Sequence, residues 1–167
     1  MNITTRRILT RLSLVACLAL PFSACKKEEA PKEVEAAAVT APTTTDKAAW
    51  QAYIVDVAKR NMDGVNASPF AYFLPAESSP EFAAEYDRLL EKVEDDVGRG
   101  IIEGNMLVFG SPSPAKMADL IVTAFTPIKP NAMKGVKVVY VGTPADAERV
   151  KAGLATAGVD YVFVEAK

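Results

Sequence analysis

The stretch VKVVYVGTP, residues 136–144, decides the fold of this chain. Its first six residues are mostly β-branched or aromatic, which favours a strand. The apolar run is nearly continuous, as is typical of a parallel strand that is covered on both faces. Gly142 ends the run, and Thr143-Pro144 places a hydroxyl at a helix N-cap and proline at the first helical position. Strand, turn and helix in this order predict one unit of an α/β domain.

Similar units lie on both sides of this stretch. Apolar residues at helical spacing predict one helix that begins after Asp46 and others through 82–98, 117–125 and 147–154. Short apolar or aromatic runs predict further strands at 69–74, 106–109 and 161–164. Helices and strands therefore alternate over residues 46–167. We expect a single three-layer α/β domain with a small, mostly parallel sheet of about four strands and flanking helices.

Hydroxyl-proline pairs are expected to start three of the helices: Ser79-Pro80, Ser113-Pro114 and Thr143-Pro144. The last two follow strands that end in glycine, so their turns should lie at the carboxyl edge of the sheet, where open α/β domains bind ligands. A helix N-terminus there suits an anion. The candidate ligand-binding residues are Gly110, Ser111, Ser113, Gly142 and Thr143. The alternative is that these sequences only turn a strand into a helix.

Catalysis finds little support in the composition. The chain has no histidine and only two cysteines, Cys17 and Cys25, which excludes histidine-based triads and the usual zinc sites. The densest acidic residues, at 91 and 94–96, are expected on the solvated face of a helix. Ser111 and Ser113 lie one turn before Lys116, but Ser113 is expected to cap a helix. We therefore expect no enzyme activity, no catalytic residues, no cofactor and no metal.

The N-terminus has the pattern of an export signal. Arg6, Arg7 and Arg11 precede an apolar run at 12–22 that is shorter than the ~20 residues of a membrane-spanning helix. The following Ser23-Ala24-Cys25 resembles the lipobox of bacterial lipoproteins, with Phe22 in place of the usual leucine. This resemblance implies that residues 1–24 are removed and that Cys25 is acylated. It implies a location at the periplasmic face of the envelope, with Lys26 favouring the outer over the inner membrane.

Two alternatives concern this signal. One is an ordinary secretory signal in which the cysteine is accidental. The other concerns the export route, because residues 5–9 also resemble a twin-arginine signal, while a basic n-region serves the general route equally well.

Residues 25–45 are expected to form the lipidated cysteine and a flexible tether. The segment is rich in charge, alanine and threonine, so it buries too little apolar surface to order itself. As a coil it would hold the domain about 25 Å from the membrane. Without the three arginines of the signal, the chain carries a net charge of −5. An acidic chain without a basic cluster is not expected to bind nucleic acid.

A second resemblance covers residues 105–165. Two units of strand, glycine-hydroxyl turn and helix begin at Gly110 and Gly142, and Val141-Gly142-Thr143, Ala147, Leu154 and Gly158 are similar to the repeat of the SPOR family. That family consists of small α/β modules that bind peptidoglycan, so the resemblance implies a wall-binding lipoprotein. Our leading hypothesis is a lipid-anchored, non-catalytic module that binds an envelope protein. Peptidoglycan binding and binding of a small anion are the alternatives.

Overall fold

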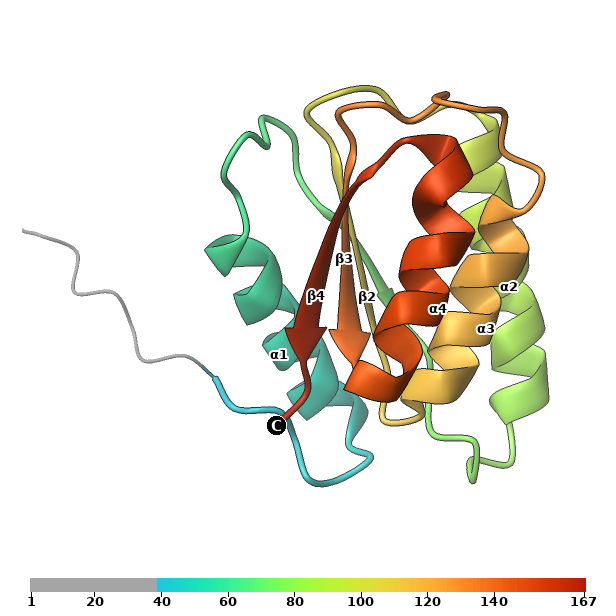
Figure 1. Ribbon diagram of the computed structural model, residues 1–167. Coiled ribbons are helices and arrows are strands. Elements are labelled where there is room, and N and C mark those ends of the chain that lie inside the picture. The colour runs from blue at the N-terminus through green and yellow to red at the C-terminus, as the bar shows by residue number, and fades with distance from the viewer. Residues whose placement is uncertain (1–38) are drawn as a thin grey trace, which may run out of the picture. The chain divides into compact units, whose positions relative to one another are not determined.

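Four parallel strands cross the domain in sequence order in the computed structural model, which describes residues 39–167 (Figure 1). Their bounds are β1 Phe70–Phe73, β2 Met106–Gly110, β3 Lys137–Gly142 and β4 Asp160–Glu165. Every neighbouring pair is parallel, with Val108 beside Val139 in the two central strands and Val139 beside Val162. The predicted mostly parallel sheet of four strands is confirmed.

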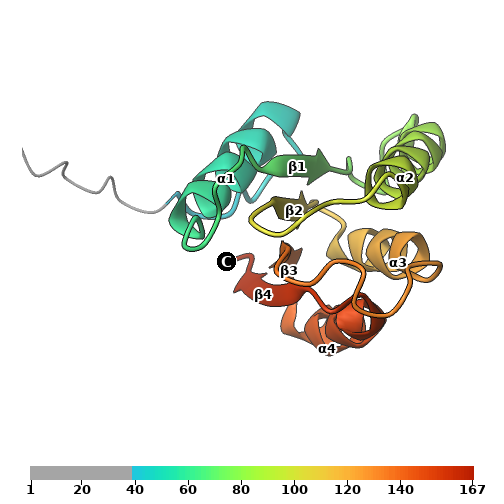
Figure 2. The same cartoon turned by 90° about the horizontal axis from the view of Figure 1, so that it is seen from above.

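The helices lie on both faces of this sheet. Their bounds are α1 Lys47–Arg60, α2 Phe82–Gly98, α3 Pro114–Phe125 and α4 Pro144–Leu154, which continues into the short 3-10 helix η1 Ala155–Ala157. Figure 2 shows α1 on one face and α2, α3 and α4 together on the other. The three connecting helices share a face because parallel strands in sequence order are joined by crossovers of one hand. The predicted three-layer α/β architecture is confirmed.

Two apolar cores fill the spaces between the layers. On the side of the three helices, the ring of Tyr72 stacks on Phe109 at 4.7 Å between centroids, and Phe125 meets Phe109 edge-on. On the other side, Trp50 and Ile54 of α1 belong to a cluster with valines of the two central strands, Val108, Val139 and Val141. The side chains of β2 are fully buried, as are nearly all of those of β3. Strands covered on both faces explain the continuous apolar runs of the sequence.

The helix starts confirm part of the predicted capping. Asp46 caps α1, since its carboxylate accepts a hydrogen bond from the Ala49 N–H at 2.8 Å. Ser113 and Thr143 are N-cap residues with proline in the first turn, but neither hydroxyl bonds the helix backbone. The prediction for Ser79-Pro80 is wrong, because α2 begins at Phe82. A separate turn, closed by the Phe82 N–H on the Ser79 carbonyl at 3.0 Å, precedes that helix.

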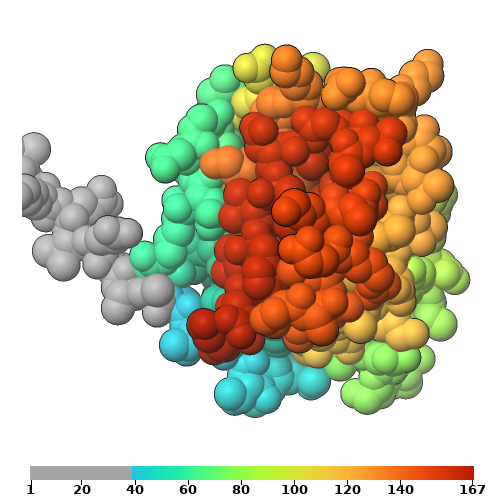
Figure 3. Space-filling model, viewed as in Figure 1, coloured from blue at the N-terminus to red at the C-terminus, as the bar shows by residue number. Residues whose placement is uncertain are grey.

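Residues 39–45 lie against the domain rather than apart from it. The Ala41 N–H donates to the Lys167 carbonyl at 3.2 Å, and the Trp50 indole donates to the Thr44 carbonyl at 2.8 Å. Figure 3 shows this segment beside the C-terminal end of β4. The described end of the predicted tether therefore belongs to the domain, and the chain enters the domain next to β4.

The predicted signal peptide, Cys25 and the tether up to residue 38 lie outside the described residues. Within residues 39–167, no helix combines the length and the apolar character that crossing a membrane requires.

Candidate functional site

The two predicted ligand turns are neighbours at the carboxyl edge of the sheet. Gly110 ends β2 and Gly142 ends β3, and Gly110 is paired with Val141 in the register. The structure thus brings together the two groups of residues that the sequence singled out. Ser111 is almost completely buried, whereas Ser113 and Thr143 are half-buried.

The hydroxyl groups of these turns have partners within the protein. The Ser111 oxygen accepts from the Ser113 N–H at 2.8 Å, and the Ser113 oxygen accepts from the Glu77 N–H at 2.8 Å. Thr143 donates to the Asp146 carboxylate at 2.8 Å. Each hydroxyl therefore ties a turn to a neighbouring segment, which gives it a structural role whether or not a ligand binds.

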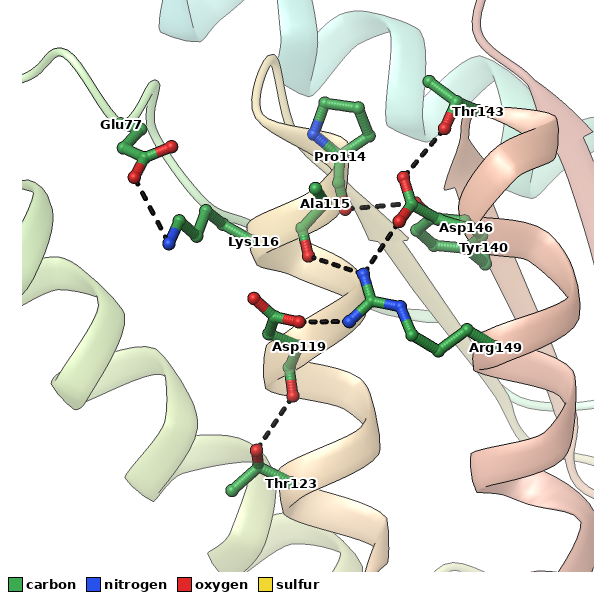
Figure 4. A network of polar contacts seen from close by, with 10 residues as sticks. All are labelled: Glu77, Pro114, Ala115, Lys116, Asp119, Thr123, Tyr140, Thr143, Asp146 and Arg149. Atoms are coloured by element: carbon green, nitrogen blue, oxygen red, sulfur yellow. Dashed lines mark hydrogen bonds and ion pairs between the residues drawn. The ribbon is translucent and has the colours of Figure 1, made fainter.

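The N-terminus of α4 already holds a negative charge of the chain itself. Asp146 lies in its first turn, and Arg149 bonds Asp146 at 2.7 Å, the Ala115 carbonyl at 3.2 Å and the carboxylate of Asp119 (Figure 4). Burial alone would raise the pKa of Asp146, but the hydrogen bonds from Arg149 and Thr143 lower it below its ordinary value. The positive end of the helix dipole is therefore balanced internally. Anion binding at these turns stays a prediction.

Close packing accounts for both glycines. A Cβ at Gly110 would lie 2.7 Å from the Ile54 side chain, and one at Gly142 would lie 2.2 Å from the Tyr140 hydroxyl. Real Cβ atoms do not approach other atoms this closely, so any side chain here would displace a buried neighbour. Packing thus requires glycine at both positions without reference to a ligand.

A groove of about 680 Å³ lies elsewhere, along the open edge of β1. Lys47 and Gln51 of α1 line one wall, and Leu89 and Lys92 of α2 line the other. The remaining lining residues are Thr45, Ala71, Tyr72, Phe73, Pro75, Ala76, Ser78, Ser79, Glu81 and Glu85. None of the five candidate ligand-binding residues lines this groove. The sequence did not indicate it, because it depends on which strand lies at the edge of the sheet.

The edge of β1 presents backbone groups to this groove. The Leu74 N–H donates to the Gly110 carbonyl at 3.4 Å. Leu74 and every second residue before it in the strand therefore direct their backbone N–H and C=O groups toward β2. Alternation along the strand turns the N–H and C=O of Ala71 and Phe73 to the opposite side. Among the described residues, no strand pairs with that side of β1.

The carboxylate of Asp96 is buried behind the α2 wall of the groove and stabilises it, so the prediction that this residue is solvated is wrong. Asp96 was expected on a solvated face, but it is only 8% exposed. It accepts hydrogen bonds from the Tyr72 hydroxyl at 2.9 Å, from Lys92 at 2.7 Å and from Arg99 at 2.5 Å. The spacing of Asp96 from Val93, which faces the core, was the available signal, because residues three apart share a helix face.

Asp96 and Tyr72 shift each other's protonation. Burial raises the pKa of Asp96, but the hydrogen bonds from Lys92, Tyr72 and Arg99 outweigh it, so the pKa lies below its ordinary value. Burial, followed by the bond to Asp96, raises the pKa of the Tyr72 hydroxyl well above its usual range. Asp96 is therefore ionised and Tyr72 is a neutral donor at neutral pH.

Comparisons with family models, with curated proteins and with solved structures find no match.

Within residues 39–167, no group of three or more aspartate, glutamate, cysteine or histidine side chains could hold a metal ion. The groove combines backbone donors and acceptors on its floor with apolar and charged side chains on its walls. Such a surface can hold a polypeptide through main-chain hydrogen bonds.

Proposed function

We propose that this protein is a lipid-anchored component of the bacterial envelope whose domain binds a partner protein and does not transform it. The anchor would be acylated Cys25 at the periplasmic face, with Lys26 favouring the outer over the inner membrane. The observation that carries the binding role is the open edge of β1 at the floor of a groove. Unpaired strand edges are templates for pairing with another chain.

The placement of the groove supports this role. The described chain begins beside the end of β4, whereas the groove follows β1 at the opposite edge of the sheet. Three strand spacings, about 14 Å, separate these edges. A domain tethered at one edge would leave the other accessible to a partner.

Replacing Cys25 with alanine tests the anchor. We expect the full chain to move almost completely from the membrane pellet to the soluble periplasmic fraction, because an acidic domain without acyl chains has little affinity for anionic lipid. Cys17→Ala is the matched control, since Cys17 would leave with the signal, and it should remain in the pellet. Density separation of inner and outer membranes gives the location. A Cys25→Ala protein that still sediments with membranes contradicts the proposed anchor.

Site-specific photocrosslinking tests the binding role. We expect benzoylphenylalanine in place of Gln51, which is exposed on the groove wall, to give a discrete protein adduct in intact bacterial cells. The same residue in place of Glu148, which is exposed on α4, should not give that adduct. Immunoblots of the full chain report both results. Absence of an adduct at position 51, or the same adduct from both positions, contradicts a partner in the groove.

Peptidoglycan is the alternative partner, which the resemblance at residues 105–165 implies. If the partner is a protein, we expect the purified chain to stay in the supernatant when peptidoglycan is pelleted. Co-sedimentation of the chain with peptidoglycan would instead favour the wall-binding function.

A further inference from the structure

We propose that the groove receives one extended segment of the partner as a fifth strand beside β1, with acidic and aliphatic side chains alternating along it. This inference rests on the proposed function and specifies its ligand. The pairing groups are the backbone N–H and C=O of Ala71 and Phe73, which point away from β2.

Prolines on both sides of β1 limit the length of strand that can pair with a partner. Pro69 lies two residues before Ala71 and Pro75 two residues after Phe73, at the positions where the next outward N–H groups would be. Each proline lacks that donor, so strand pairing cannot extend past either end. The open edge therefore fits a short segment rather than the continuous edge of another sheet.

The walls of the groove also exclude a second copy of this domain. Helices line both sides of the β1 edge, with Lys47 and Gln51 on α1 and Glu85 and Leu89 on α2 (Figure 2). In a second copy, β1 would lie in the same recess between its own helices. Two recessed edges cannot come within the strand spacing of about 4.8 Å, whereas a single chain can.

The side chains on the two walls favour a partner segment in which acidic and aliphatic residues alternate. Lys47 is exposed on the α1 wall and has no ion pair with any described residue, so it suits a carboxylate. On the α2 wall, Leu89 offers a half-buried apolar surface, and the Lys92 ammonium is already paired with Asp96 at 2.7 Å. Glu85 on this wall is paired with Arg88, so the carboxylate of Glu81, which has no ion pair with any described residue, is the group that would repel an acidic side chain. Because successive side chains of a strand face opposite sides, acidic residues would face α1 and aliphatic residues would face α2.

The α2 wall is held in place before any partner binds. Asp96 fixes the Lys92 ammonium at 2.7 Å, and that ammonium lies 5.6 Å from the centre of the Tyr72 ring. Tyr72 is itself held by Asp96 and by its stack on Phe109. A wall whose side chains are already ordered loses less entropy on binding.

A labelled octapeptide of alternating glutamate and valine is the probe, measured by fluorescence anisotropy with the full chain in detergent. A copy with four glutamates followed by four valines should bind at least about tenfold more weakly, because it loses the alternation. Two further copies are N-methylated, one at every valine and the other at every glutamate. Only one edge of an added strand faces β1, so one methylated copy should lose about tenfold and the other should keep its affinity. Equal affinity of all four peptides overturns the inference.

Variants of the protein complete the test. Ala71→Pro removes only an N–H that points into the groove, so the domain should fold and bind the probe at least about tenfold more weakly, while Ala71→Ser should bind like the wild type. Lys47→Glu should weaken binding about threefold and favour a lysine-valine probe. Unchanged binding by Ala71→Pro overturns the fifth strand. If no probe binds while the Gln51 adduct forms, this inference fails and the proposed function stands; if that adduct is also absent, both fail.

Discussion

Replacing Gly142 with alanine is expected to destabilise the domain by about 3 kcal/mol. Residues two apart in a strand share a face, so the Tyr140 ring lies against the Cα of Gly142, and an added Cβ would lie 2.2 Å from the ring hydroxyl and 2.3 Å from the ring carbon that bears it. The ring is fully buried, and its hydroxyl donates to the Pro114 carbonyl at 3.0 Å. It can move only by giving up this bond and disturbing the core around it.

Gly98→Ala is the matched control. A Cβ at Gly98 meets nothing within 4 Å, and Gly98 is the last residue of α2. Alanine favours helix over glycine, so this variant should be as stable as the wild type or up to about 1 kcal/mol more stable. Urea unfolding at neutral pH measures both variants. A loss below about 1 kcal/mol for Gly142→Ala would contradict the packing explanation and return attention to a ligand at this turn.

The layers of the fold could be predicted from the sequence because a strand that is buried on both faces has a nearly continuous apolar sequence. The nearly continuous apolar run at 136–141 marked a central parallel strand, and β3 is almost completely buried. The helix stripe that begins after Asp46 marked α1, whose cap is confirmed. Local residue types and spacings carried both predictions, so tertiary context was not needed.

The groove could not be predicted, because it arises from strand order and from contacts between distant residues. Nothing in the residues of β1 states that this strand is at an edge; that follows from its pairing with β2 alone. The burial of Asp96 likewise depends on Tyr72, which is 24 residues away. Ser79-Pro80 has the composition of a helix start, but its turn closes before α2 begins.

Replacing Asp96 with alanine is expected to cost about 2 kcal/mol of unfolding free energy at neutral pH. Most of the loss should come from the Tyr72 hydroxyl, which is left buried without its acceptor. Lys92 and Arg99 contribute little, because their side chains are 58% and 73% exposed and can turn to water. Asp95→Ala, at the exposed neighbouring position, is the control and should change stability by less than about 0.5 kcal/mol. Equal losses in the two variants would contradict the role of the buried carboxylate.

The same carboxylate should make stability depend on pH in the acid range. The pKa of Asp96 in the folded domain lies below its ordinary value of 3.8, so the unfolded chain takes up the proton first as the pH falls. The stabilisation is therefore complete above that ordinary value and is lost as the pH falls through the lower, folded pKa.

Asp96→Asn keeps an acceptor for Tyr72 but cannot titrate. We expect the wild type to exceed Asp96→Asn in unfolding free energy at pH 7, and the difference to shrink as the pH is lowered from about 5 to 3. Asp56 and Asp146, whose pKa values are also lowered, titrate alike in both proteins and cancel in the difference. A difference that stays constant or grows toward low pH would contradict an ionised Asp96 held by hydrogen bonds.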